Sequence, residues 1–344
     1  MHTVELGDFS KMDEQRYLSI GDGKVYLVNH DPLDEFDAVL RDMLLDDTTP
    51  EFDAAERIEF SGSENYTILR DEDGKSLCAD DSYFTDGQPL DTDNVETFLS
   101  AIQSLSLTNY VSYHVTDEEL AAFGLNGPEL TIKIAYSTSN EDGNTEDSGT
   151  LLLRISRNPE EAAAYEEATE KSEDDLPDVT CYVRVGQSRI VYEISQDVYD
   201  QLTAVSYDDT LRHQILFTAD FETVTRIDVA LSGENYTFTY HPPEDKDAEG
   251  TWTYNGEEFD VYDLETALRA ISAFRFTDET PAGQEEISLT VHLDNEDFPT
   301  FTLMLYRLDG TNCVAAVDGK TVALVSRSKT VDLIEAVNEL TLGG

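Results

Sequence analysis

The sequence predicts an α+β protein of tandem, related units, each an antiparallel β-meander with one or two helices packed on one face. Two repeated patterns lead to this prediction. The stretch ERIEFSGSENYTIL at 56–69 returns as TRIDVALSGENYTF at 225–238, and the similarity continues in register beyond both copies. A glycine-turn hairpin followed by a short amphipathic helix occurs three times. Such self-similarity indicates an internal repeat.

Two strands open each copy of the first pattern. Ile58 and Phe60 alternate with charged neighbours, and Ile227 and Val229 do the same in the second copy. A Ser-Gly turn then predicts a second strand, at 66–68 or 236–238.

An amphipathic helix follows these strands in both copies. Its apolar stripe is Val95, Phe98, Leu99, Ile102 and Leu105 in the first copy, and Leu264, Leu268, Ile271 and Phe274 in the second. Asp91 and Asp260 precede the two stripes, and we expect their carboxylates to cap the helices.

The hairpin-and-helix pattern sets the predicted domain boundaries. Its copies lie at 16–44, 181–205 and 312–337. Residues 51–218 and 219–344 then form complete units, and residues 1–50 form the back half of an incomplete first unit. We expect the missing front half, with any signal or anchor, to lie upstream of Met1.

Two low-complexity stretches interrupt the first complete unit. TSNEDGNTEDSG at 138–149 predicts a long solvated hairpin loop. NPEEAAAYEEATEKSEDD at 158–175 predicts an exposed acidic helix or a disordered insertion. The second unit lacks both, so we expect neither to belong to the core.

The net charge of the chain limits the kinds of partner that it could bind. Seventy-three acidic against 22 basic residues give a formal net charge of −51, which disfavours binding to nucleic acid and anionic lipid. Solubility is the favoured explanation of this charge, and a high-salt habitat is a minor alternative. The sequence contains neither a long apolar run nor a signal-peptide pattern at its start.

Sequence motifs indicate no catalytic, cofactor or metal-binding residues. Cys78, Cys181 and Cys313 are far apart, and we expect free, buried thiols. The histidines show no ligand spacing, and no nucleophile or nucleotide-binding motif occurs. The best metal candidate is a calcium-loop-like run with Asp245, Asp247, Glu249 and Gly250, but its twelfth position is Gly256 in place of Glu. A charged hairpin turn between strands explains this run better.

At LAAFGLNGPELTIKIAY (120–136) the chain resembles the DUF4340 family of bacterial cell-envelope proteins, which have no assigned activity. The resemblance is carried by a hairpin, a helix and the motif L-x-x-[FY]-G-L-x-x-P, formed here by Leu120, Phe123, Gly124, Leu125 and Pro128. LRHQILF at 211–217 resembles the close of the family unit, whereas 276–291 in the second unit lacks the motif.

The motif has a structural interpretation. We expect a positive φ at Gly124, burial of Leu125, and a stop to any helix at Pro128 before the next strand.

The resemblance implies a protein held outside the membrane, encoded beside ABC-transporter components of the gliding-motility type. We therefore expect a non-catalytic, extracytoplasmic, membrane-associated accessory or scaffold protein of the cell envelope. Its partners would be proteins such as ABC-transporter components, and it would reach the membrane only through an anchor outside this chain. The alternative is an acidic binding module for divalent cations or basic cell-wall polymer. A hydrolase using a carboxylate pair is the least favoured class.

Overall fold

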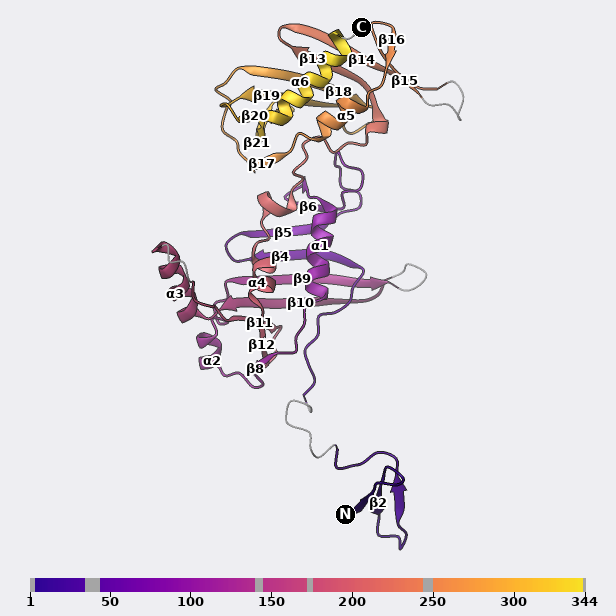
Figure 1. Ribbon diagram of the computed structural model, residues 1–344, viewed down its shortest axis with the longest axis vertical. Helices are drawn as coiled ribbons and strands as arrows, with labels where there is room; N and C mark the ends of the chain where they lie inside the picture. The colour runs from indigo at the N-terminus through magenta and orange to yellow at the C-terminus, as the bar shows by residue number, and fades with distance from the viewer. Residues whose placement is uncertain (1–3, 35–43, 140–144, 172–175, 244–249, 343–344) are drawn as a thin grey trace. The chain divides into compact units, whose positions relative to one another are not determined.

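The computed structural model describes residues 4–34, 44–139, 145–171, 176–243 and 250–342, and its fold is α+β as predicted. It contains one three-stranded sheet and two nine-stranded antiparallel sheets (Figure 1). The chain divides into two compact units, Met1–Thr48 and Thr49–Gly344.

The small N-terminal unit is the three-stranded antiparallel sheet of β1 (Glu5–Ser10), β2 (Gln15–Ser19) and β3 (Tyr26–Val28). The hairpin predicted within 16–44 is present as β2 and β3, with Arg16 opposite Val28. Most of the segment predicted to form the following helix, residues 35–43, lies outside the described residues. No side chain described in this unit is fully buried, so its sheet has little apolar core.

The first nine-stranded sheet has the order β7-β6-β5-β4-β9-β10-β11-β12-β8. Its strands are β4 (Ala54–Ser61), β5 (Asn65–Arg70), β6 (Tyr83–Thr85), β7 (Gln88–Pro89), β8 (Tyr110–Ser112), β9 (Leu130–Ser139), β10 (Thr145–Arg157), β11 (Cys181–Val185) and β12 (Val191–Ile194). The accompanying helices are α1 (Thr92–Gln103), α2 (Asp117–Ala122), α3 (Pro159–Glu170), α4 (Gln196–Thr203) and the π-helical turn η2 (Tyr207–Leu211).

The second nine-stranded sheet repeats this order as β16-β15-β14-β13-β18-β19-β20-β21-β17. Its strands are β13 (Val224–Leu231), β14 (Glu234–His241), β15 (Thr251–Tyr254), β16 (Glu257–Phe259), β17 (Ala273–Phe276), β18 (Glu285–Leu293), β19 (Thr300–Arg307), β20 (Asn312–Val317) and β21 (Lys320–Ser326). Its helices are the short η3 (Phe221–Thr223), α5 (Tyr262–Arg269) and α6 (Arg327–Leu342).

The two large sheets correspond strand by strand. β4 and β13 hold the same central place, and each is followed by a meander to one edge, a helix, the opposite edge strand and a second meander. The register also agrees, since Ile58 lies between Ile68 and Ile134 while Ile227 lies between Phe238 and Val291. The tandem β-meanders predicted from the sequence are therefore confirmed. The finer division at residues 51 and 219 stays a prediction.

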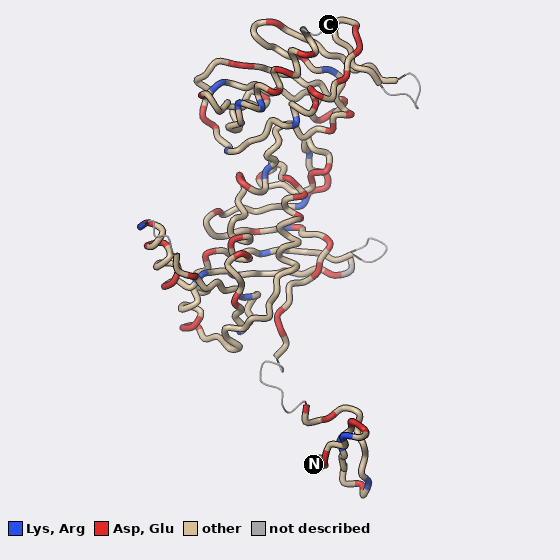
Figure 2. The backbone as a smooth tube through the Cα atoms, viewed as in Figure 1, with Lys and Arg blue, Asp and Glu red and all other residues tan. Residues whose placement is uncertain are grey.

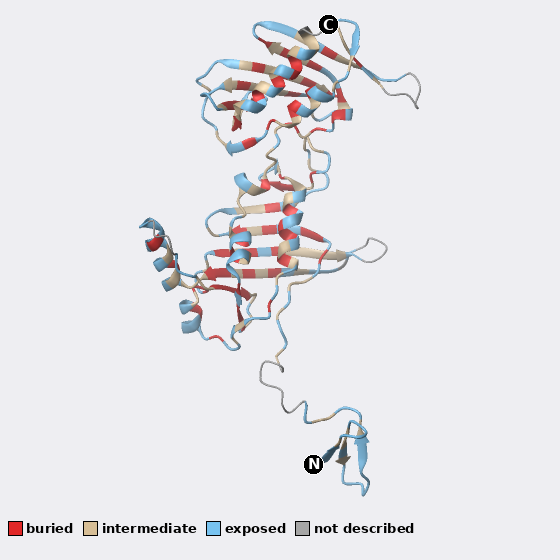
Figure 3. Cartoon of the chain, viewed as in Figure 1, coloured by how far each residue is buried: buried red, intermediate tan, exposed pale blue. Residues whose placement is uncertain are grey.

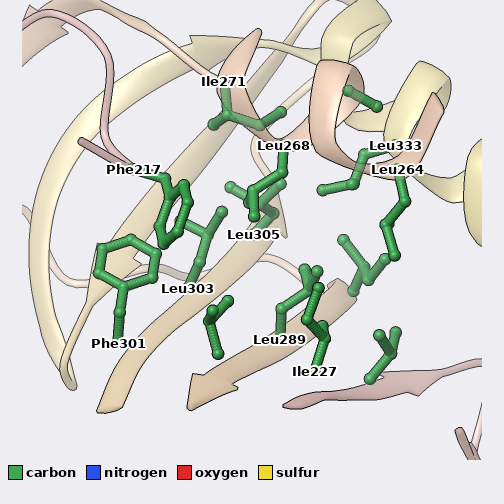
Figure 4. Packing of buried hydrophobic residues seen from close by; sticks show 14 of the residues in the cluster. Phe217, Ile227, Leu264, Leu268, Ile271, Leu289, Phe301, Leu303, Leu305 and Leu333 are labelled. Carbon is green, nitrogen blue, oxygen red and sulfur yellow. The ribbon is translucent and has the colours of Figure 1, made fainter. Parts of the chain in front are cut away.

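Each of the two large sheets buries one face beneath two helices (Figure 3). Ile58 packs in one core with Ile102 of α1 and Leu202 of α4. In the second sheet, the core includes Leu289, Leu268 of α5 and Leu333 of α6, as Figure 4 shows. Strand alternation directs every second side chain to the opposite face, which these helices leave uncovered.

The predicted helical stripes extend past the helices themselves. α1 ends at Gln103, so Leu105 lies beyond it. In the second copy the chain leaves α5 to form the edge strand β17, where Phe274 is 55% exposed. Asp91 caps α1 as predicted. The Asp260 carboxylate also accepts an amide hydrogen at the helix start, that of Tyr262, but the N-cap position itself is Val261, one residue later than predicted.

The predicted loop at 138–149 was too long. β9 and β10 continue their pairing as far as Ser139 opposite Thr145, because the β-branched threonines of this segment suit an extended strand. The predicted insertion at 158–175 contains α3, which buries Ala162 and Ala168. The disordered alternative is therefore wrong for Pro159–Glu170. Within the described parts of the chain, no helix is long and apolar enough to cross a membrane.

Candidate functional site

The family motif forms a small core on the reverse side of the first nine-stranded sheet. Along β11, Cys181 and Val183 face the main core, and Tyr182 between them faces the opposite side. There Tyr182 packs with Leu120 and Leu125 of the motif. The Phe123 ring lies 4.9 Å from the Tyr182 ring, and Pro128 lies just before β9.

Gly124 has the predicted positive φ, at 74°. A β-carbon at this position would lie 2.5 Å from Ser156 Oγ and 3.0 Å from the carbonyl oxygen of Arg157. The backbone conformation and the close approach of β10 therefore both favour glycine. These contacts give the motif a packing role.

A polar cluster that no sequence pattern indicated lies beside the start of α1. His213 Nε2 is 2.8 and 3.0 Å from the two carboxylate oxygens of Asp81. On its other side, His213 Nδ1 is 3.4 Å from Asp91 Oδ2. Cys78 completes a set in which the sulfur, one Asp81 oxygen and one His213 nitrogen lie within 4.8 Å of one another.

Three short segments position this cluster. Cys78 and Asp81 lie on one turn between β5 and β6, closed by a bond from the amide of Asp81 to the carbonyl of Cys78. Ser76 Oγ donates a 2.6 Å hydrogen bond to Asp81. The amide of Asp91 bonds to the carbonyl of Leu211, which ties the start of α1 to the chain segment that carries His213.

The cluster is largely withdrawn from solvent. The Asp81 side chain is 1% exposed and that of His213 is 21% exposed. Burial lowers the pKa of His213, but the hydrogen bond that its ring N–H donates to Asp81 and the charges of Asp81 and Asp91 outweigh it, so the pKa is raised overall. Burial raises the pKa of the Cys78 thiol, and the neighbouring carboxylates add to that shift.

A cleft of about 400 Å³ borders the cluster. His213 and Ser76 line it together with apolar side chains that include Phe276 and Phe298. Arg212 also lines the cleft, and its guanidinium carbon lies 3.7 Å from the centre of the Phe276 ring. The cleft therefore combines an apolar wall with basic groups, in a protein whose net charge is strongly acidic.

A second polar group, formed by Glu129, Arg157 and Tyr199, links the start of β9 to β10 and to helix α4. Glu129, just before β9, accepts hydrogen bonds from the guanidinium of Arg157 at the end of β10, the shortest being 2.7 Å. Tyr199 of α4 donates a 2.8 Å hydrogen bond to the same carboxylate. Burial raises the pKa of Glu129, but these hydrogen bonds lower it more, so the carboxylate is held ionised.

The structure describes all three cysteines but only part of the calcium-loop-like run. Cys181 and Cys313 are buried free thiols as expected, whereas Cys78 is partly exposed. Asp245, Asp247 and Glu249 lie outside the described residues. The segments on either side of that run are strands, as the hairpin interpretation requires.

Comparison with protein families finds a match within this chain. The model described as "Domain of unknown function (DUF4340)" matches residues 85–290. The chain belongs to the DUF4340 family. Neither a curated protein nor a solved structure matches it.

The DUF4340 match begins near the end of β6 and ends within β18, so it extends from the first large sheet into the second. The motif around Gly124 lies inside the match, and so do Asp91 and His213. Cys78 and Asp81 lie before it. Half of the polar cluster is therefore outside the segment that defines the family.

Proposed function

We propose that this chain is a non-catalytic accessory or scaffold protein of the bacterial cell envelope, which acts outside the cytoplasmic membrane with an ABC-type export system. Membership of DUF4340 supports this proposal through the cellular setting that the family resemblance implies. The link to transport rests on analogy with the family.

The observation that carries the scaffold role is a pair of matching patches on the two large sheets. On the face opposite α1, α4, α5 and α6, Arg57 pairs with Glu59 in β4, and Arg226 pairs with Asp228 at the corresponding positions of β13. A neighbouring strand contributes a further basic group to each patch, from Lys133 or His292. We call these groups the β4 patch (Arg57, Glu59, Lys133) and the β13 patch (Arg226, Asp228, His292).

Two like patches in one chain suit a partner that presents two matching surfaces. Once one patch is bound, the second contact forms within the same complex, at a raised effective concentration. The charged groups of both patches are partly exposed, so they are accessible to such a partner. Acidic residues are distributed along the whole described chain in Figure 2, which favours general solvation over a localised site for basic polymer.

Crosslinking in cells followed by purification tests this proposal. The chromosomal gene would carry an affinity tag, and mass spectrometry would identify the captured proteins. We expect recovery with the membrane fraction and enrichment of ABC-transporter subunits. Recovery in the cytoplasmic fraction with no enriched membrane protein would refute the proposal.

A pair of charge reversals makes the test specific to the patches. Lys133 in the β4 patch and Lys171 at the end of α3 are both exposed, and each pairs with a glutamate. We expect Lys133→Glu to reduce capture of the transporter subunits and Lys171→Glu to leave it unchanged. Equal capture by the two variants would remove the β4 patch from the proposal.

A further inference from the structure

The side chains around Asp81 supply three different kinds of metal-binding atom at one place. The Cys78 sulfur, one Asp81 carboxylate oxygen and one His213 nitrogen lie within 4.8 Å of one another. In a tetrahedral zinc site, bond lengths of about 2.0–2.3 Å place ligand atoms about 3–4 Å apart. The separation of at most 4.8 Å among these atoms is close to that spacing.

From this arrangement we propose that Cys78, Asp81 and His213 bind a divalent transition metal of the zinc type. This site goes beyond the scaffold function and does not depend on it. A thiolate and an imidazole favour zinc over calcium or magnesium, which prefer oxygen ligands. The proposed site uses none of the residues of the calcium-like run at 245–250.

The surrounding groups are those that a metal site needs. Asp91 lies against His213 Nδ1, and a carboxylate there holds the ring proton on Nδ1 so that Nε2 faces the metal. Ser76 Oγ holds the carboxylate of Asp81 through its 2.6 Å hydrogen bond. The turn from Cys78 to Asp81 fixes two of the three ligands in one backbone segment.

The cleft offers a route to the metal. His213 and Ser76 line both the cluster and the cleft, so water from the cleft would supply the remaining coordination position. Three protein ligands with one solvent position is a common arrangement for zinc. An ion pair of His213 with Asp81 and Asp91 would account for the two carboxylates but not for the nearby Cys78 thiol.

Binding of Co²⁺ to the reduced, chelator-treated chain tests the site directly. Tetrahedral cobalt with a thiolate ligand gives visible absorption and a near-ultraviolet sulfur-to-cobalt charge-transfer band. We expect both to saturate at one equivalent, to be displaced by Zn²⁺, and to persist in excess Ca²⁺. If the reduced protein gives no charge-transfer band, or if Ca²⁺ removes it, the proposal is wrong.

A matched pair of cysteine variants assigns the sulfur ligand. We expect Cys78→Ala to abolish the charge-transfer band and Cys181→Ala to retain it, with circular dichroism confirming that both variants fold. Zn²⁺ affinity, measured against a chromophoric chelator, should fall in Cys78→Ala by more than the roughly 10–100-fold associated with loss of an outer-shell group. Equal Zn²⁺ affinity in Cys78→Ala and wild type would overturn the site.

Asp91→Asn tests the positioning role of Asp91 without removing the helix cap, since Asn and Asp cap helices about equally well. We expect Zn²⁺ affinity roughly 10–100-fold below wild type while the charge-transfer band remains. An unchanged affinity would show that Asp91 serves only as the cap of α1. Failure of these metal experiments would leave the transporter-capture experiment unaffected.

Discussion

At the scale of single residues, Gly124 is the position where the backbone restricts the sequence most clearly. Its φ of 74° is unfavourable for other residues, and a β-carbon would collide with Ser156 and the backbone of Arg157. We therefore expect Gly124→Ala to lower the free energy of unfolding by roughly 1–3 kcal/mol. Urea denaturation followed by tryptophan fluorescence and circular dichroism would measure the change.

Gly127 provides the matched control for this substitution. It lies in the same connection between α2 and β9, and a β-carbon there would meet nothing within 4 Å. Gly127→Ala should change the free energy of unfolding by no more than about 0.5 kcal/mol. If the two variants are equally stable, the backbone at Gly124 imposes no special requirement.

At the scale of elements, Glu129 connects β9, β10 and α4 through Arg157 and Tyr199. Its pKa is lowered in the folded state, so its ionised form adds stability above the pKa of the unfolded chain, and that stability is lost as the pH falls through the lowered value. At pH 7 we expect Glu129→Gln to lower the free energy of unfolding by about 1–3 kcal/mol.

Chemical denaturation of both proteins at pH 7 and near pH 3 checks this prediction. The difference between wild type and Glu129→Gln should shrink at the lower pH, because the wild-type carboxyl is then increasingly protonated. Comparing the two proteins at each pH cancels the effect of the other acidic groups. A difference of equal size at both pH values would contradict an electrostatic role for Glu129.

At the scale of the whole molecule, the net charge of −51 crowds like charges in the folded state more than in the unfolded chain. This repulsion raises the average carboxylate pKa on folding, so the folded state binds more protons and mild acidification from pH 7 toward 5 should maintain or increase stability. Groups whose pKa is lowered, such as Asp228, oppose this trend at lower pH.

Added sodium chloride should also raise the melting temperature, since the screening length falls to about 10 Å at 0.1 M. The effect should level off at higher concentrations. Thermal melting in the presence of a chelator would measure it without a contribution from transition metals. A melting temperature that falls as salt is added would mean that attractive ion pairs dominate over the general repulsion.

The sequence by itself determined the repeated parts of this protein. Apolar periodicity is local, so the strands around Ile58 and Ile227, the helix at Val95–Ile102 and the positive φ at Gly124 could be predicted from neighbouring residues. Local patterns were less informative at element ends, where pairing with another strand placed Phe274 in β17 and extended β9 and β10.

The cluster of Cys78, Asp81 and His213 was decided only by the tertiary structure. His213 is 132 residues from Asp81 in sequence, and it reaches that carboxylate because the chain returns to the start of α1 after completing the first large sheet.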